Sequence, residues 1–407
     1  MLPKHERLPA CKTFPSPTST LPYWRKELHP LDSYRSTDGL PEITDIAIIG
    51  GGMTGISTAY NILKEHENQG TEPPTITVLE ARQLCSGATG RNGGHLKLPP
   101  FQVAKVLDSH GVKAANQLAE FYMDQMYALK DVVEQEKLDC DFLITRSFNV
   151  WVMEDDAEHY LNEVRMLIDH DIEIVKREVQ ILKKEMIEAV TSVKGAAAAI
   201  SVPAAQLWPY KFVTQLAARI IDRINMQTHT MVDAVSDETD IDGFYTIKTR
   251  RGVLRAKKIV FATNAYTAGV LPYLQGVITP YRGQNSYMKR CQQDQVGWFY
   301  RNVKADTLRW PTRCYTHNIS AGSEHEYIIH RPDGGTILGG GKKVFQEDTS
   351  EWLAVVDDGV LMQEKKVRAY FKDRMETYYD DWTQSGAEVD IIWSGSKYYI
   401  DIYFDIG

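Results

Sequence analysis

Hydrophobic and polar positions near the start of the chain follow a strand, helix, strand order. Residues 45–50 (DIAIIG) form a short apolar, β-branched run, which is typical of a buried parallel strand. Residues 54–67 then carry apolar or small side chains at helical spacing, at Ile56, Ala59, Tyr60 and Leu63. A second β-branched run, residues 75–80, follows the loop NQGTEPP. This order predicts a βαβ unit and hence a doubly wound α/β domain.

Further along the chain, helical and strand-like patterns continue. Apolar residues at helical spacing predict helices over residues 102–136, 155–169, 208–225 and 355–378. Short apolar or β-branched runs predict strands over residues 147–153, 231–235, 258–263, 287–289, 326–330 and 336–338, and a hairpin of 244–249 with 253–256. Turns such as PDGG at 332–335 separate the later strands, which favours a mixed or antiparallel second sheet.

We expect this order of elements to divide the chain into three parts. Residues 1–44 are rich in Pro, Ser and Thr and lack periodicity, so they should form an extended arm, pinned to the body by Tyr23 and Trp24. The doubly wound domain is discontinuous and comprises residues 45–100, 205–275 and 380–407. Residues 101–204 and 276–379 form an inserted α+β domain with a mixed sheet and helices.

The turn after the first strand reads GGGMTG, residues 50–55. Gly50 permits a tight turn, Gly52 lets the backbone approach a pyrophosphate, and Gly55 lets helix and strand pack closely. The helix N-terminus offers free N–H groups and the positive end of the helix dipole to that phosphate. Glu80 follows Gly55 by 25 positions, near the spacing of about 20 expected for a carboxylate that binds ribose hydroxyls. The turn therefore predicts a dinucleotide site.

A second glycine-rich loop follows Glu80. Residues 86–95 (SGATGRNGGH) contain four glycines and almost no aliphatic bulk, so this loop can lie flat against a ligand. Its N–H groups can reach a second phosphate or a flavin ring, and the guanidinium groups of Arg82 and Arg91 can pair with phosphate oxygens. A nicotinamide-dependent dehydrogenase would share the βαβ unit but has no general need for this loop. The loop therefore favours a flavin.

Together these segments resemble the D-amino-acid-oxidase-like FAD-dependent oxidoreductases, particularly the fungal and bacterial branch near gamma-glutamylputrescine oxidase. The resemblance runs from about residue 23 to about residue 395 and rests on the segments DIAIIGGGMTGISTAY, VLEAR, CSGATGRNGGHLK, IVFATNAYT, ITPYRGQ and HRPDGGTILGGG.

The resemblance implies a bound FAD. The glycine turn would hold the pyrophosphate, Glu80 the adenosine ribose, residues 86–95 the isoalloxazine, and the backbone of Val232 the adenine, while Thr263 and Asn264 begin a second crossover. The cofactor-binding set implied is Gly50, Gly51, Gly52, Met53, Thr54, Gly55, Glu80, Ala81, Arg82, Ser86, Gly87, Ala88, Thr89, Gly90, Arg91, Asn92, Gly93, Gly94, His95, Val232, Thr263 and Asn264. His95 is either a hydrogen-bonding loop residue or a covalent attachment point for the flavin.

By the same resemblance, the protein would oxidise a C–N bond of an amine or amino acid to an imine, with dioxygen reoxidising the flavin to give peroxide. The substrate candidates flank the strands that face the flavin in the resembling fold: Tyr281, Arg282, Tyr327 and His330, with Arg331 beside them. An arginine can grip a substrate carboxylate through two hydrogen bonds. This chemistry needs no metal and no nucleophile, so we nominate neither a metal ligand nor a catalytic residue.

Composition narrows the classes of partner. A net charge of −8 and a pI near 5.8, without a long Lys/Arg run, disfavour nucleic acid. The five cysteines are odd in number, scattered and never in a Cys-x-x-Cys pair, which indicates reduced thiols inside the cell. The chain lacks a signal-type apolar region and a run of eighteen apolar residues. We expect a cytoplasmic protein, with a peroxisomal location left open.

The resemblance ends near residue 395. Members of the resembling family continue past a segment like WSG (393–395) into a strand and helix that complete the flavin domain, whereas residues 396–407 here are rich in Tyr, Ile and Asp. Ser-Lys-Tyr at 396–398 can be encoded as AGT AAG TAT, which contains a typical intron start. We therefore expect a tail of translated intron. The alternative function that follows is a truncated, catalytically inactive flavin-fold paralogue or binding protein.

Overall fold

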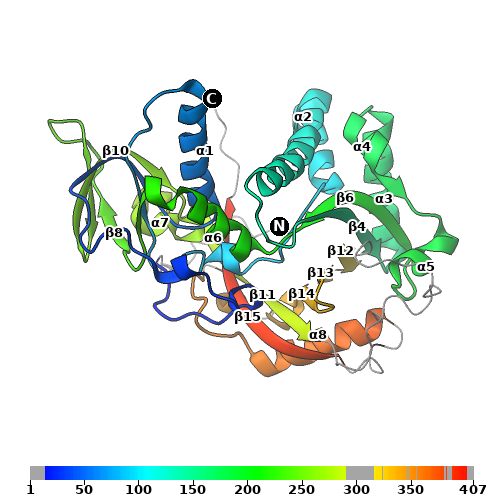
Figure 1. The fold of residues 1–407 in the computed structure, drawn as a ribbon. Helices are drawn as coiled ribbons and strands as arrows, with labels where there is room; N and C mark the ends of the chain where they lie inside the picture. The colour runs from blue at the N-terminus through cyan, green and yellow to red at the C-terminus, as the bar shows by residue number, and fades with distance from the viewer. Residues whose placement is uncertain are drawn as a thin grey trace.

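The computed structural model describes residues 14–289, 316–322, 324–345, 348–353, 355–379, 382 and 387–400. Within these residues two β-sheets lie side by side, each with helices against it (Figure 1). Residues 1–13 of the predicted arm and residues 401–407 of the predicted tail lie outside the described residues.

The first sheet has six strands in the order β7-β2-β1-β10-β9-β8. Their bounds are β7 Asn225–Gln227, β2 Ile76–Leu79, β1 Ile43–Ile49, β10 Gly252–Phe261, β9 Tyr245–Thr249 and β8 Val232–Val235. β1 runs parallel to β2 on one side and to β10 on the other. Since β2 follows β1 closely and β10 comes from far along the chain, the strand order changes direction at β1, where open α/β sheets bind their ligands.

Residues of β1 are buried on both faces of the sheet, as its continuous apolar run predicted. Ile48 packs toward α1 (Met53–Gln69) and α6 (Pro209–Ile220), whereas Ala47 and Ile49 pack toward the opposite face, where α7 (Thr267–Val270) lies. α1 buries Ile56, Ala59, Tyr60 and Leu63, confirming the predicted face.

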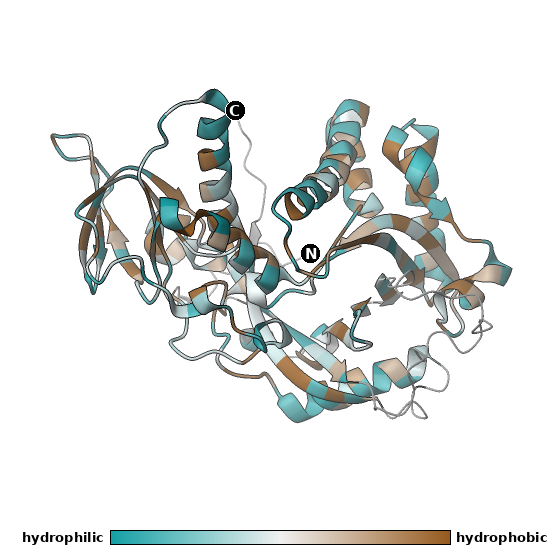
Figure 2. Ribbon diagram, in the orientation of Figure 1, coloured by the Kyte–Doolittle hydropathy of each residue, from teal (hydrophilic) through white to brown (hydrophobic). Residues whose placement is uncertain are grey.

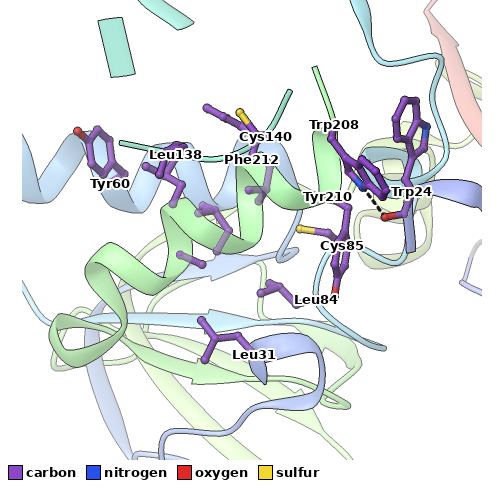
Figure 3. Close-up of a cluster of buried hydrophobic side chains, with 14 of the residues drawn as sticks. Trp24, Leu31, Tyr60, Leu84, Cys85, Leu138, Cys140, Trp208, Tyr210 and Phe212 are labelled. Carbon is purple, nitrogen blue, oxygen red and sulfur yellow. Dashed lines mark hydrogen bonds between the residues drawn. The ribbon is translucent and has the colours of Figure 1, made fainter. Parts of the chain in front are cut away.

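α6 is shorter than predicted, because the chain leaves the helix after Ile220 and enters β7 at Asn225. Its first residue is Pro209, where a missing N–H has no cost. Beside the helix start, the Nε1 of Trp208 donates to the carbonyl of Trp24 at 2.6 Å. Figure 3 shows this hydrogen bond at one end of the buried cluster that joins α1, α6 and the arm. Trp24 therefore pins the arm to the body, as predicted.

The second sheet has nine strands, eight of them in the order β15-β11-β14-β13-β12-β4-β6-β3, with β5 paired to β6. Their bounds are β15 Glu388–Ile400, β11 Ile278–Lys289, β14 Thr336–Gly340, β13 Glu324–His330, β12 Thr316–Ala321, β4 Leu143–Trp151, β6 Ala198–Gln206, β3 His95–Lys97 and β5 Gln180–Ile181. β12 and β4 pair in parallel and their other neighbours are antiparallel, which confirms the predicted mixed sheet.

The strands at one edge of this sheet correct two expectations. β11 is a single strand of 12 residues, where the sequence suggested a short strand at 287–289. β15 pairs with β11 along its length, so residues 388–400 lie in the second sheet, although we had grouped 380–407 with the first. The long-range pairing of two strands about a hundred residues apart overrides the local pattern. The domain boundaries themselves stay a prediction.

Helices cover both faces of the second sheet. α2 (Pro100–Gln135), α3 (Glu154–Asp169) and α4 (Glu173–Glu178) pack on one face, and α5 (Ile187–Thr191) and α8 (Glu364–Tyr378) on the other. β6 between them is buried at every position and largely hydrophobic (Figure 2). α8 begins nine residues later than the predicted 355, because residues 355–363 form a nonhelical segment that carries the fully buried Asp358.

In the described part of the chain, no helix is both long enough and apolar enough to cross a membrane. Cys85 and Cys140 are buried free thiols, and the other three cysteines lie outside the described residues.

Candidate functional site

A cavity of about 830 Å³ lies at the carboxyl ends of the parallel strands in the first sheet and extends to the second sheet. The last residues of three parallel strands line it: Ile49 of β1, Leu79 of β2 and Phe261 of β10. Its far wall comes from β11, β13 and β15, through Tyr281, Tyr327 and Gly395. Its volume falls within the usual range for cofactor and ligand sites.

The glycine turn is packed more tightly than any other residue would allow. A Cβ on Gly55 would lie 1.9 Å from the carbonyl oxygen of Gly50, so α1 can approach the turn only without a side chain there. Gly50 has a φ of +113°, and a Cβ on it would lie 2.4 Å from the carbonyl oxygen of Ala262. This packing brings the N-terminus of α1, the positive end of its dipole, to the cavity wall at Met53 and Thr54.

Glu80 connects the two glycine-rich segments. Its Oε2 accepts from the N–H of Gly51 at 2.8 Å, and its Oε1 accepts from the N–H of Arg82 at 2.9 Å. A carboxylate has about four lone-pair sites, so the two oxygens can still accept hydroxyl donors from the cavity. Glu80 therefore fits the predicted ribose-binding position.

Hydrogen bonds of its own side chains hold the second glycine-rich loop in place. Thr89 Oγ1 accepts from the N–H of Met53 at 2.8 Å, which joins the loop to the start of α1. Asn92 closes the loop, since its Nδ2 donates to the carbonyl of Thr89 at 3.0 Å and its Oδ1 accepts from the N–H of Gly94 at 2.7 Å. These hydrogen bonds fix the conformation of the loop at the cavity wall.

Most of the predicted cofactor residues lie on the cavity wall: Gly50, Gly52, Met53, Thr54, Glu80, Ala81, Arg82, Gly87, Ala88, Thr89, Arg91, Asn92, Val232, Thr263 and Asn264. Seven do not line it: Gly51, Gly55, Ser86, Gly90, Gly93, Gly94 and His95. Several of these pack behind the wall instead. A Cβ on Gly90 would lie 2.4 Å from the carbonyl oxygen of Cys85, and one on Gly94 would lie 2.7 Å from the Trp24 ring.

The guanidinium groups of Arg82 and Arg91, for which a phosphate role stays a prediction, are engaged by acceptors of the protein itself. Arg82 makes two hydrogen bonds to the carboxylate of Asp358, at 2.8 and 3.0 Å. Arg91 donates to the carbonyls of Ser86 and Ser394 at 2.7 Å each, and its Nε lies 3.3 Å from Asp358 Oδ2. Burial by itself would lower the pKa of Arg82, but its hydrogen bonds to Asp358 raise it above the usual value. Burial lowers the pKa of Arg91 to about 10, although Asp358 acts in the opposite sense.

The four substrate candidates separate into two pairs. Tyr281 and Tyr327 line the cavity, whereas Arg282 and His330 do not. Arg282 donates to the backbone carbonyls of Asp357 and Glu351, at 2.9 and 2.7 Å, so its charge holds a loop in place. His330 is surrounded by protein and lies with its Nδ1 3.2 Å from Thr336 Oγ1; burial holds its pKa well below the usual range. Arg331 is also buried, paired with Asp141 at 2.8 Å.

Tyr327 is fitted between two glycines. A Cβ on Gly93 would lie 2.6 Å from its ring, and one on Gly339 would lie 2.0 Å from it. Its hydroxyl donates to Asn285 Oδ1, and burial raises its pKa above the usual range. His95 packs edge-on to this ring, at 5.6 Å between centroids, and burial lowers the pKa of His95 to about 3. His95 is therefore a neutral residue beside the Tyr327 ring.

Sequence reasoning missed three wall residues that matter. Phe14 and Pro15 come from the N-terminal arm, whose composition gave no sign of a binding role. Lys397 is on β15, with its Nζ about equidistant from the rings of Tyr281 and Tyr327, at 6.0 and 5.9 Å. Desolvation by the surrounding protein lowers its pKa, although the side chain is exposed in the open cavity. It lies beyond residue 395, where the sequence motifs used for the resemblance end, so none of them could nominate it.

A protein-family model described as FAD dependent oxidoreductase matches residues 45–400. The chain belongs to this family. Its cofactor is FAD, and the residues fit that group: the cavity is large enough, the α1 N-terminus faces it, and Glu80 has spare acceptor capacity. The first sheet, with its glycine turn, is accordingly the FAD-binding Rossmann-type part of the fold. Among the residues placed in the structure, no group of three His, Cys, Asp or Glu side chains could hold a metal ion.

Solved structures share this fold. Glycine oxidase from Geobacillus kaustophilus superposes with a TM-score of 0.62 at 15% identity, over 89% of this chain and 84% of that chain. L-amino acid deaminase from Proteus myxofaciens gives 0.62 at 13% identity, over 90% and 83%. L-alpha-glycerophosphate oxidase from Mycoplasma pneumoniae, with FAD bound, gives a TM-score of 0.60 at 17% identity. The superposition covers 89% of this chain and 85% of that chain.

Curated relatives match over a shorter stretch. Gamma-glutamylputrescine oxidoreductase of Escherichia coli is 28% identical over 99 residues, which is 24% of this chain and 22% of that protein. A putative Rieske 2Fe-2S iron-sulfur protein of Bacillus subtilis is 26% identical over 100 residues, 24% of this chain and 18% of that protein. The matched stretch is thus about a fifth of each relative.

Proposed function

We propose that this protein oxidises the carbon–nitrogen bond of an amine or amino acid to an imine. The observation that supports this proposal is the single cavity that joins the glycine turn of the first sheet to the tyrosines of the second. The reaction removes two electrons and two protons from the substrate, and dioxygen takes up both to give hydrogen peroxide. FAD supplies the electron-accepting chemistry when bound. The imine then reacts with water to give a carbonyl compound and an amine or ammonia.

The residues of this chain would bind and orient the substrate. Tyr281 and Tyr327 offer aromatic walls to its carbon skeleton, and Asn285 fixes the direction of the Tyr327 hydroxyl. Lys397 places a cation at the same end of the cavity, where it would attract a substrate carboxylate. Binding such an anion would favour the charged form of Lys397 and so raise its lowered pKa.

The names of the relatives point to the same class of substrate. Glycine oxidase and L-amino acid deaminase act on amino acids, and gamma-glutamylputrescine oxidoreductase carries the name of an amine conjugate. A substrate with both an amine and a carboxylate fits the tyrosines and Lys397 together.

The test is anaerobic reduction of the FAD-loaded protein. A panel of amino acids and amines without a carboxylate is mixed with the protein under nitrogen, and bleaching of the visible flavin absorbance is followed. We expect bleaching by at least one carboxylate-bearing amine, and one hydrogen peroxide per substrate after air is admitted. Lys397→Met should raise the concentration needed for half-maximal bleaching by about tenfold or more for that compound, and Lys342→Met, which changes a lysine off the cavity wall, should not. A protein that holds FAD and is bleached by no amine would instead support the inactive, flavin-binding alternative.

A further inference from the structure

The N-terminal arm, here residues 14–25, reaches the FAD cavity from outside both sheets. Phe14 and Pro15 line the cavity. Phe14 also packs against the buried cluster that contains Ile49, Leu79 and Val232, at the carboxyl ends of the parallel strands. The arm therefore contributes a side of the cavity that neither sheet provides.

Three buried residues, Asp358, Arg91 and Arg82, hold the middle of the arm. The N–H and the Oγ1 of Thr20 both donate to the carbonyl of Asp358, at 2.9 and 3.0 Å. The Nη1 of Arg91 donates to Thr20 Oγ1 at 2.8 Å. The Nη1 of Arg82 donates to the carbonyl of Ser16 at 3.2 Å. The arm also packs closely on Gly359. A Cβ at this position would lie 2.5 Å from the carbonyl oxygen of Thr18.

The end of the arm is fastened to the loop that lines the cavity. Trp24 is fully buried and its Nε1 donates to the carbonyl of Asn92 at 2.6 Å. Since Arg82, Arg91 and Asn92 all lie on the cavity wall, the same short segment of chain holds the arm and faces the cofactor space. Displacement of the arm would remove Phe14 and Pro15 from the cavity. It would also break the hydrogen bonds that the arm makes with Arg82, Arg91 and Asn92 on the cavity wall.

We propose that the docked arm is part of the FAD site, with Phe14 and Pro15 as its outer wall. Cofactor binding and arm docking then support each other, because two events that stabilise the same arrangement are reciprocally coupled. The inference rests on FAD binding, which family membership gives, and not on which substrate is oxidised.

The experiment compares Phe14→Ala with Leu21→Ala in the full chain. Leu21 lies in the same arm but is 62% exposed, so it controls for a change of a large apolar side chain in this segment. The dissociation constant of FAD is measured by quenching of flavin fluorescence. We expect Phe14→Ala to raise it about tenfold, equivalent to about 1.4 kcal/mol, and Leu21→Ala to leave it within about twofold of the wild type.

A second measurement needs no variant. Hydrogen exchange of the Thr20 amide is followed in the wild-type protein with and without FAD, and binding should slow it. Equal FAD affinities for both variants and the wild type, or Thr20 exchange that FAD does not change, would overturn the inference. Neither readout uses turnover, so a protein that binds FAD in this way but oxidises no amine would contradict the proposed function alone.

Discussion

Replacing Asp358 by Asn tests the buried charge cluster behind the cavity. The side chains of Asp358 and Arg91 are each 1% exposed, and that of Arg82 is 8% exposed. Asn has the same shape but no charge, and its amide NH2 would face a guanidinium that also donates. Removing one partner of a buried ion pair leaves the other charge uncompensated, which costs about 3–5 kcal/mol. We expect a loss of that size in the free energy of unfolding, because two guanidinium groups depend on this carboxylate.

The measurement is urea unfolding followed by tryptophan fluorescence, with Asp171→Asn as the matched control. Asp171 pairs with Lys176 at 2.7 Å, but both side chains are more than half exposed. Water screens such a pair, so the control should leave the unfolding midpoint nearly unchanged. If Asp358→Asn were as mild as Asp171→Asn, the cluster would not stabilise the fold and our reading of Arg82 and Arg91 would be wrong.

Three further changes probe the FAD site and the core. Glu80→Gln should raise the FAD dissociation constant about 10- to 100-fold, measured by flavin fluorescence, because hydrogen bonds to a charged group contribute about 1.5–3 kcal/mol; an unchanged constant would exclude Glu80 as a cofactor ligand. Gly55→Ala should destabilise the protein by about 1–3 kcal/mol in urea unfolding, since its Cβ would lie 1.9 Å from Gly50 O, whereas Gly39→Ala meets no atom within 4 Å and should be neutral. His317→Phe should reduce the loss of folding stability at acidic pH. Burial lowers the pKa of His317 to about 4 from 6.5, so the unfolded state takes up the proton first and stability falls between pH 6.5 and 4. Between pH 7.5 and 4.5 the free energy of unfolding of the wild type should fall by about 2–3 kcal/mol more than that of the variant. Parallel profiles of unfolding free energy against pH would contradict this.

The FAD half of the fold could be predicted because its signals are local. The run DIAIIG, the glycine turn and the helical spacing of Ile56 to Leu63 all lie within about twenty residues, and each has a direct steric or burial consequence. Glu80 was predictable for the same reason, since its distance along the chain from Gly55 is set by one helix and one strand.

The second sheet was harder to predict because its order depends on pairing between distant strands. β15 pairs with β11 across about a hundred residues, and β12 pairs in parallel with β4 across an even longer stretch of chain. A period-two pattern identifies a strand but not its neighbour. This is why residues 388–400 were grouped with the wrong sheet, and why β11 was expected to be short.

The protein partners of three arginines could not be predicted for a related reason. Arg82, Arg91 and Arg282 stand beside ligand-type motifs, and a guanidinium is well suited to phosphate or carboxylate. Sequence cannot show that Asp358 lies against the first two, 276 residues from Arg82, or that two backbone carbonyls hold the third. A buried guanidinium must be paired, so its nearest buried acceptor decides its role before any ligand arrives. This leaves Glu80 and backbone N–H groups on the cavity wall beside the glycine turn, and Lys397 beside Tyr281 and Tyr327. That division predicts that neutralising Lys397 affects substrate binding and neutralising Glu80 affects FAD binding.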